Sequence, residues 1–189
     1  MTWLDERGRN GGADEIPLPD SAPGRLVVCG KHFVGPDVED ALARTSTTVV
    51  VCLNEEHEIG DRYPDYVAWL RANTPGRALW HPIPDLHAPA LDDARALVAE
   101  LRARLSGGEH VLLHCGAGIG RAGTFAAAVL IDHGVTLDEA LQTVGDARPM
   151  AGPEVGAQLD LLRAFARQNT APRPPGCREN DRVARQARQ

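Results

Sequence analysis

The spacing of hydrophobic and polar residues predicts strands that alternate with helices between residues 25 and 168. Short apolar runs, rich in valine and leucine, predict strands at 26–29, 47–53, 78–83 and 110–114. Apolar residues at helical spacing predict helices at 37–44, 63–73, 91–105, 121–133, 136–148 and 153–168. This alternation indicates an α/β fold, with a central, mostly parallel sheet of about four to five strands and helices on both faces.

Local signals support two of these helix starts. Thr136 and Glu139 form a capping-box pattern, and Pro153 suits the first turn of a helix. We therefore expect helices to begin next to Thr136 and Pro153.

The two ends of the chain differ in composition from the middle. Residues 1–24 hold glycines, prolines and acids without periodicity, and residues 169–189 are rich in proline, arginine and glutamine. The 189 residues, 43% of them hydrophobic, are enough for one globular domain with a sizeable core. We expect a disordered N-terminal segment at 1–24, one domain at 25–168 and a disordered basic tail at 169–189.

Composition excludes several classes of function. A net charge of -6 argues against a dedicated nucleic-acid binder. No apolar run has the length of a membrane span or the form of a secretory signal, so we expect a cytoplasmic protein without a membrane partner. The four cysteines, at 29, 52, 115 and 177, show no C-x-x-C spacing. We expect no metal and no cofactor, and the sequence indicates no oligomeric state.

Residues 110–131, HVLLHCGAGIGRAGTFAAAVLI, join a predicted strand to a predicted helix through a glycine-rich bend. Gly118, Gly120 and Gly123 satisfy G-x-G-x-x-G, the pattern of a dinucleotide-binding turn. That site also needs a second parallel strand that ends in an acid about 20 residues further on. Here another predicted helix follows, so the pattern disfavours a dehydrogenase.

The same bend fits a phosphate site better. A loop that runs from a strand to a helix N-terminus directs backbone N–H groups and the helix dipole toward an oxyanion. Arg121 adds a planar fork that suits phosphate, and the same positive field favours the thiolate of Cys115, a strong nucleophile. The residues predicted to bind phosphate are Gly116, Ala117, Gly118, Ile119, Gly120 and Arg121.

The run H-C-G-A-G-I-G-R-A-G at 114–123 resembles the H-C-x5-R loop of the cysteine-dependent protein tyrosine phosphatases, in their compact dual-specificity branch. The resemblance covers about residues 25–168 and implies the same α/β fold. It also implies hydrolysis of a phosphomonoester through a phosphocysteine at Cys115. The implied partner is a phosphorylated protein or a small phosphomonoester.

The family uses an aspartic acid on an upstream loop as general acid and then general base. Asp85, in H-P-I-P-D-L-H-A-P, follows the preceding predicted strand and matches that position. Asp92 and Asp93 are the alternatives, although acids in the first turn of a helix are favoured by the helix dipole alone.

Two further residues resemble supporting residues of the family. His114 matches a buried histidine that orients the loop, with a plain strand histidine as the alternative. Gln158 resembles the glutamine that positions the hydrolytic water, although an exposed helical glutamine is equally ordinary.

Acids and cysteines near the predicted site have simpler interpretations. Glu55, Glu56 and Glu58 are placed to orient Arg121 from the rim, but a solvated acidic loop is the favoured interpretation. Cys52 lies in an apolar strand, where cysteine acts as a small hydrophobe. Some family members protect the nucleophile with a disulfide, which Cys52 would supply here.

Ala122 departs from the family pattern. Most members carry Ser or Thr directly after the loop arginine, where the hydroxyl stabilises the departing thiolate. Thr124 lies two residues further on and is expected to face elsewhere. The sequence therefore supports an active phosphatase first, and a phosphate-recognising binding module with negligible turnover second. A sulfurtransferase is less consistent, because its cysteine loop is usually shorter and does not call for Asp85.

The substrate is less well defined. The loop holds no lysine between Cys115 and Arg121, which disfavours the phosphoinositide branch and favours phosphotyrosine. The short chain lacks room for segments that deepen the pocket, so a shallow site that also admits phosphoserine or phosphothreonine is an alternative.

Overall fold

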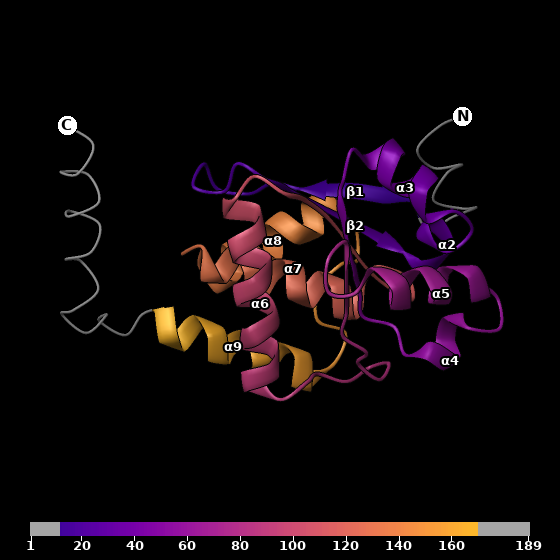
Figure 1. Ribbon diagram of the computed structural model, residues 1–189. Coiled ribbons are helices and arrows are strands. Elements are labelled where there is room, and N and C mark those ends of the chain that lie inside the picture. Colours follow the sequence, from indigo (N-terminus) through magenta and orange to yellow (C-terminus); the bar gives the residue numbers. More distant parts are fainter. Residues whose placement is uncertain (1–11, 170–189) are drawn as a thin grey trace, which may run out of the picture.

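A five-stranded sheet organises the structure, a computed structural model that describes residues 12–169 (Figure 1). The strand order is β1-β2-β5-β3-β4, with bounds β1 (Ala13–Ile16), β2 (Arg25–Gly30), β3 (Val49–Cys52), β4 (Ala78–Trp80) and β5 (His110–Cys115). The four strands β2 to β5 are parallel, and β1 pairs antiparallel with β2. The predicted α/β class with a mostly parallel sheet is confirmed.

Helices cover both faces of the sheet, as Figure 1 shows. One face is covered by α2 (Lys31–Val34), α3 (Val38–Thr45), α4 (Glu56–Ile59) and α5 (Pro64–Asn73). The other face is covered by α6 (Leu91–Ser106), α7 (Gly120–Asp132), α8 (Leu137–Ala147) and α9 (Gly156–Asn169). Each face therefore has its own hydrophobic core.

The alternation of side chains along the strands divides these two cores. In β5, Val111 and Leu113 face the α7 side, whereas Leu112 faces the α5 side. Helix α7 is buried along nearly its whole length because it lies between the sheet and α6, α8 and α9. This position explains its run of small residues, Ala126, Ala127 and Ala128, which lets neighbouring helices approach closely.

Several local expectations were wrong. Ala13–Ile16 forms the edge strand β1, although residues up to 24 were expected to be disordered. The short helices α2 and α4 were not predicted, and α9 begins at Gly156 rather than at Pro153. The expectations for residues 1–11 and for the tail at 170–189 lie outside the described residues.

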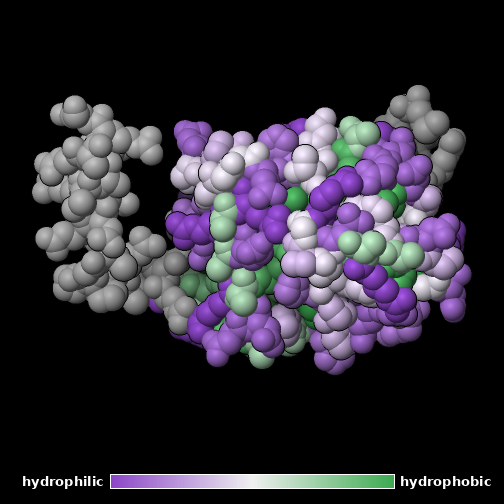
Figure 2. Space-filling view, in the orientation of Figure 1, coloured by the Kyte–Doolittle hydropathy of each residue, from purple (hydrophilic) through white to green (hydrophobic). Residues whose placement is uncertain are grey.

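The surface seen in Figure 2 is mostly polar, with small apolar areas that are separated from one another. Among residues 12–169, no helix combines the length and the apolar character that crossing a bilayer requires.

Candidate active site

The carboxyl ends of β4 and β5 and the start of α7 bring Asp85, Cys115 and Arg121 together. Cys115 ends β5, and Asp85 follows β4. Arg121 lies in the first turn of α7, and its Nη2 lies 3.0 Å from Oδ1 of Asp85. A Cβ added at Gly116, next to Cys115, would lie 3.4 Å from the same nitrogen. Ligands of parallel sheets bind at this edge. Residues 85, 115 and 121 therefore belong to one site.

The loop between β5 and α7 has each of its carbonyl oxygens tied to a neighbouring segment. Gly116 O accepts from the Lys31 N–H at 3.0 Å, and Ile119 O accepts from the Gly123 N–H at 2.8 Å and the Gly152 N–H at 3.3 Å. The Arg148 guanidinium donates to Gly118 O at 2.7 Å and Ala117 O at 2.8 Å. Neighbouring segments thus hold the loop from outside.

The loop N–H groups point the other way. In a trans peptide the carbonyl and the following N–H are antiparallel, so outward carbonyls at 116–119 direct the N–H groups of 117–120 inward. Within residues 12–169, these four N–H groups donate to no protein acceptor. Together with the positive end of the α7 dipole, they form a cradle for an oxyanion beside Cys115.

Gly118 is required by the loop geometry. Its φ is 71°, in the left-handed region, and an added Cβ would lie 2.3 Å from the carbonyl oxygen of Cys29. Both observations exclude a side chain at this position.

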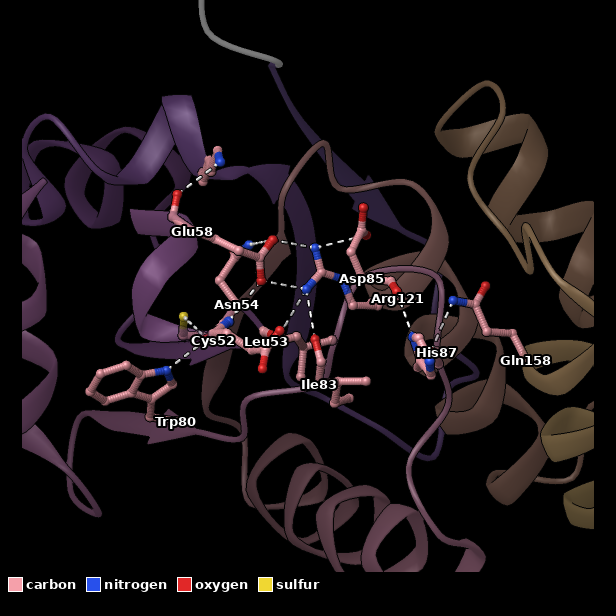
Figure 3. A network of polar contacts seen from close by, with 12 residues as sticks. Cys52, Leu53, Asn54, Glu58, Trp80, Ile83, Asp85, His87, Arg121 and Gln158 are labelled. Carbon is pink, nitrogen blue, oxygen red and sulfur yellow. Dashed lines mark hydrogen bonds and ion pairs between the residues drawn. The ribbon is translucent and has the colours of Figure 1, made fainter. Parts of the chain in front are cut away.

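Arg121 is 3% exposed and its terminal nitrogens are fully used (Figure 3). They donate to the two carboxylate oxygens of Glu58 at 2.7 Å each, and Nη1 also donates to Ile83 O at 2.7 Å. Nη2 lies 3.0 Å from Oδ1 of Asp85. Among the described residues, the buried Nε has no partner. That N–H is available to a ligand.

Glu58 orients Arg121, so the favoured interpretation of a solvated acidic loop was wrong for this residue. Its carboxylate also accepts from Asn54 Nδ2 and from the Glu55 N–H, each at 2.8 Å. Burial alone would raise the pKa of Glu58, but these hydrogen bonds and the Arg121 charge lower it to about 2. Glu56 instead pairs with Arg71 at the surface.

Asp85 lies on a loop that is anchored on both sides of it. Ile83 N–H donates to Leu53 O at 3.0 Å, and the His87 ring and N–H bond back to the turn at residues 84 and 85. The Asp85 side chain is 68% exposed and reaches the arginine from the solvent side. The alternatives, Asp92 and Asp93, lie in the first turn of α6, where Asp92 pairs with Arg95.

Gln158 lies in α9 and connects the loop that carries Asp85 to the segment just before α9. Its Nε2 donates to His87 O at 3.2 Å (Figure 3). Its Oε1 accepts from the Glu154 N–H at 2.8 Å and from the Thr124 hydroxyl at 3.5 Å. It is 1% exposed, so it is not the exposed helical glutamine that was the alternative. Both ends of its amide bind protein.

His114 is fully buried under the loop. Its Nε2 lies 2.5 Å from the Tyr66 hydroxyl, a contact that fixes the ring. Burial lowers the pKa of His114 to about 4. The imidazole is therefore neutral at pH 7.

The structure also shows the surroundings of Ala122, Thr124 and Cys52. Ala122 is fully buried, and the hydroxyl of Thr124 faces Gln158, as expected. Cys52 packs in the core on the α5 side, whereas Cys115 packs on the α7 side, and both thiols are free. Burial raises the pKa of Cys52 to about 12. This arrangement does not favour the Cys52–Cys115 disulfide.

Sequence reasoning missed Arg148 and Asp14. Arg148 caps the end of α8, and its Nη1 lies 2.5 Å from the Asp14 carboxylate on β1. Their side chains are 3% and 8% exposed. Through Arg148 the pair anchors the loop between β5 and α7, and no local pattern marks two residues so far apart in the chain.

A family model and one curated relative match most of this chain. The family, described as PTP-SAK: Swiss Army Knife protein, DSP-PTPase phosphatase domain, matches residues 22–172. Dual specificity phosphatase 28 of Homo sapiens is 32% identical over 163 residues, which are 84% of each chain.

Solved structures share the fold. Tk-PTP in its active form has a TM-score of 0.64 and 28% identity, over 80% of this chain and 99% of that chain. Kinase associated phosphatase, with its catalytic site cysteine replaced by serine, has a TM-score of 0.70 over 85% of this chain and 96% of that chain. Its identity is 19%, so this second likeness supports the fold alone.

Proposed function

The chain belongs to the compact dual-specificity branch of the cysteine-dependent protein tyrosine phosphatases, and on that premise we propose that it hydrolyses phosphomonoesters of proteins, phosphotyrosine first, through a phosphocysteine. The proposal rests on one observation. The outward carbonyls of residues 116–119 leave N–H groups directed inward beside Cys115, where an oxyanion would bind.

In the first step, the cradle and Arg121 bind the phosphate oxygens, with the Arg121 Nε as an available donor. The Cys115 thiolate attacks phosphorus, so an S–P bond forms while the bond to the leaving oxygen breaks. Asp85 donates its proton to that oxygen. The bound phosphate replaces the Asp85 carboxylate on the guanidinium and releases Asp85 toward the leaving group.

In the second step, water attacks the phosphocysteine. Asp85 accepts the proton of that water, the S–P bond breaks, and phosphate and the Cys115 thiolate are released. The N–H cradle stabilises the charge in both transition states. At position 122, no hydroxyl is present to stabilise the departing thiolate.

Other residues are proposed to act by positioning Cys115, Arg121 and Asp85. We propose that His114 and Tyr66 fix the end of β5 and so the direction of Cys115. Gln158 is proposed as a positioning residue for the Asp85 loop, because its amide is used by His87 O and by the Glu154 N–H.

The second candidate function is a phosphate-recognising module with negligible turnover. Ala122 favours it, because loss of the hydroxyl slows release of the thiolate. Hydrolysis of para-nitrophenyl phosphate separates the two functions.

An enzyme releases para-nitrophenol over many turnovers, and Cys115→Ser abolishes this while still binding vanadate. Arg121→Lys should impair both steps severely, because an ammonium cannot reproduce the planar fork. Full activity in Cys115→Ser would overturn the mechanism. Vanadate binding without turnover in the wild type would support the binding module.

A further inference from the structure

Two cations lie on neighbouring segments, one of which holds the loop between β5 and α7. Lys31 is the only lysine of the sequence, and its backbone N–H is the one that holds Gly116 O at 3.0 Å. Arg62 is exposed, and its guanidinium lies 5.7 Å from the centre of the Tyr63 ring. The Tyr63 hydroxyl and the His32 Nδ1 are 2.6 Å apart. This contact joins the segment of Lys31 to that of Arg62.

Neither cation has a carboxylate partner among residues 12–169. Every arginine from Arg25 to Arg163 other than Arg62 lies within 3.7 Å of a carboxylate oxygen. The Lys31 amine donates instead to the main-chain oxygen of Glu58 at 2.9 Å. In a chain of net charge -6, two cations without a carboxylate partner, on segments joined by the His32–Tyr63 contact, are an exception.

His32 follows Lys31 in the chain, and its ring contacts the hydroxyl of Tyr63, which follows Arg62. Burial, then the charge of Arg62, then that of Lys31 lower the pKa of His32. Glu58, whose main-chain oxygen accepts from the Lys31 amine, has its carboxylate paired with Arg121. We define Lys31 and Arg62 as the cationic rim.

We propose that the cationic rim binds acidic side chains next to the phosphorylated residue, so that the preferred substrates are phosphotyrosine segments with acidic neighbours. This inference rests on the proposed phosphatase function. An extended peptide advances about 3.3 Å per residue, so neighbours of a phosphotyrosine seated at Cys115 pass along the surrounding rim. The two cations come from different elements, α2 and the α4–α5 connection, which suits a chain that passes both.

The experiment compares three phosphotyrosine peptides of equal length, with acidic, neutral or basic residues beside the phosphotyrosine. For each variant, kcat/KM on a peptide is divided by that variant's own rate on para-nitrophenyl phosphate. Because exposed ion pairs are individually weak, we expect the wild type to prefer the acidic over the neutral peptide about three- to tenfold. The preference should fall as salt is added.

The variants give the decisive result. Arg62→Glu should reverse the order, so that the basic peptide becomes the better substrate, and Lys31→Gln with Arg62→Gln should remove the preference. Arg163→Gln is the matched control, because Arg163 is also exposed but pairs within α9. It should keep the preference of the wild type.

An acidic-to-basic ratio that is the same in the wild type and Arg62→Glu would overturn the proposal. A kcat/KM that is higher for a small bisphosphate than for any peptide, and that falls in Arg62→Glu, would overturn the proposal and indicate a small-molecule substrate. If no peptide is hydrolysed, the proposed function fails, and the rim is tested separately by binding of the same peptides to Cys115→Ser. Tighter binding of the acidic peptide than of the basic peptide would support the proposed role of the cationic rim. Equal binding of the peptides would overturn it.

Discussion

Glu58 holds both terminal nitrogens of Arg121 at 2.7 Å, in the parallel geometry that a carboxylate and a guanidinium prefer. The two residues come from different elements, α4 and α7, and both are largely buried. The orientation of the arginine is therefore fixed by the fold before a phosphate arrives. A pre-oriented fork loses less conformational entropy on binding than a mobile one.

Glu58→Gln tests this relationship through activity. The amide can accept only one of the two hydrogen bonds, and its NH2 group faces a donor of Arg121. Since a hydrogen bond to a charged group contributes about 1.5–3 kcal/mol, kcat/KM for para-nitrophenyl phosphate should fall about ten- to 100-fold. Glu56→Gln is the matched control, because Glu56 pairs with Arg71 at the surface. Equal activities of the two variants would contradict the prediction.

The contact between Glu58 and Arg121 should also make the free energy of unfolding depend on pH in the acidic range. The pKa of Glu58 is lowered from its ordinary 4.5 to about 2 in the folded protein. A lowered pKa contributes stability that is fully present above the unfolded value and is lost as the pH falls toward the folded value. The free energy of unfolding should therefore fall between pH 4.5 and about 2, and fall less steeply in Glu58→Gln. Urea unfolding at several pH values measures this, and equal slopes would exclude the effect.

The sequence was sufficient for the main elements because their signals are local. The apolar runs of β2, β3 and β5 and the stripe of α6 depend only on neighbouring residues. The same holds for the strand–loop–helix context of Cys115 and Arg121. Short elements lack such signals, and β1, with two acids among four residues, is a strand only because β2 pairs with it.

Contacts between distant segments were not predictable in the same way. Sequence spacing placed three glutamates near the site, but only the turn of α4 decides that Glu58 faces Arg121. The pair of Asp14 and Arg148 joins residues 134 positions apart. Gln158 was singled out from a resemblance, and its contact with His87 O depends on how α9 packs beside the loop that carries Asp85.

The Arg148–Asp14 ion pair should affect stability and activity in different ways. Arg148→Gln removes the Arg148 charge from beside the buried Asp14 carboxylate, so unfolding should become easier by about 3–5 kcal/mol. It also removes the donors to Ala117 O and Gly118 O. In the double variant with Asp14→Asn, stability should return in large part, because the buried charge is gone, while activity should stay low. Recovery of activity in the double variant would show that the loop does not need this anchor.

Gln158→Leu tests whether this residue positions the loop that carries Asp85. If it holds Asp85 in place, the loss of kcat/KM should grow as the leaving group becomes a poorer one, since only such substrates depend on the proton from Asp85. The kcat/KM for alkyl phosphates should fall about tenfold or more, and the kcat/KM for para-nitrophenyl phosphate should fall much less. A residue that positions water acts at the second step, which is the same for both classes of substrate, so its loss would lower kcat and leave kcat/KM unchanged. An unchanged kcat/KM with a lower kcat would therefore indicate that Gln158 positions water.

Ala122→Ser tests why turnover should be slow. Ala122 is fully buried in the first turn of α7, and the nearby hydroxyl of Thr124 is directed to Gln158 rather than to the thiol. Without a hydroxyl at 122, the thiolate of Cys115 leaves less readily in the second step, whereas its attack in the first step hardly changes. Breakdown of the phosphocysteine should then limit the rate.

Stopped-flow measurement should show a burst of para-nitrophenol equal to the enzyme concentration, followed by slow turnover. In Ala122→Ser the burst should shrink and the steady rate should rise about tenfold, because a hydrogen bond to a charged group contributes about 1.5–3 kcal/mol. Ala126→Ser, one turn further along α7 and equally buried, is the control for the added hydroxyl itself and should keep the burst. If the wild type shows no burst and Ala122→Ser leaves turnover unchanged, another group stabilises the departing thiolate.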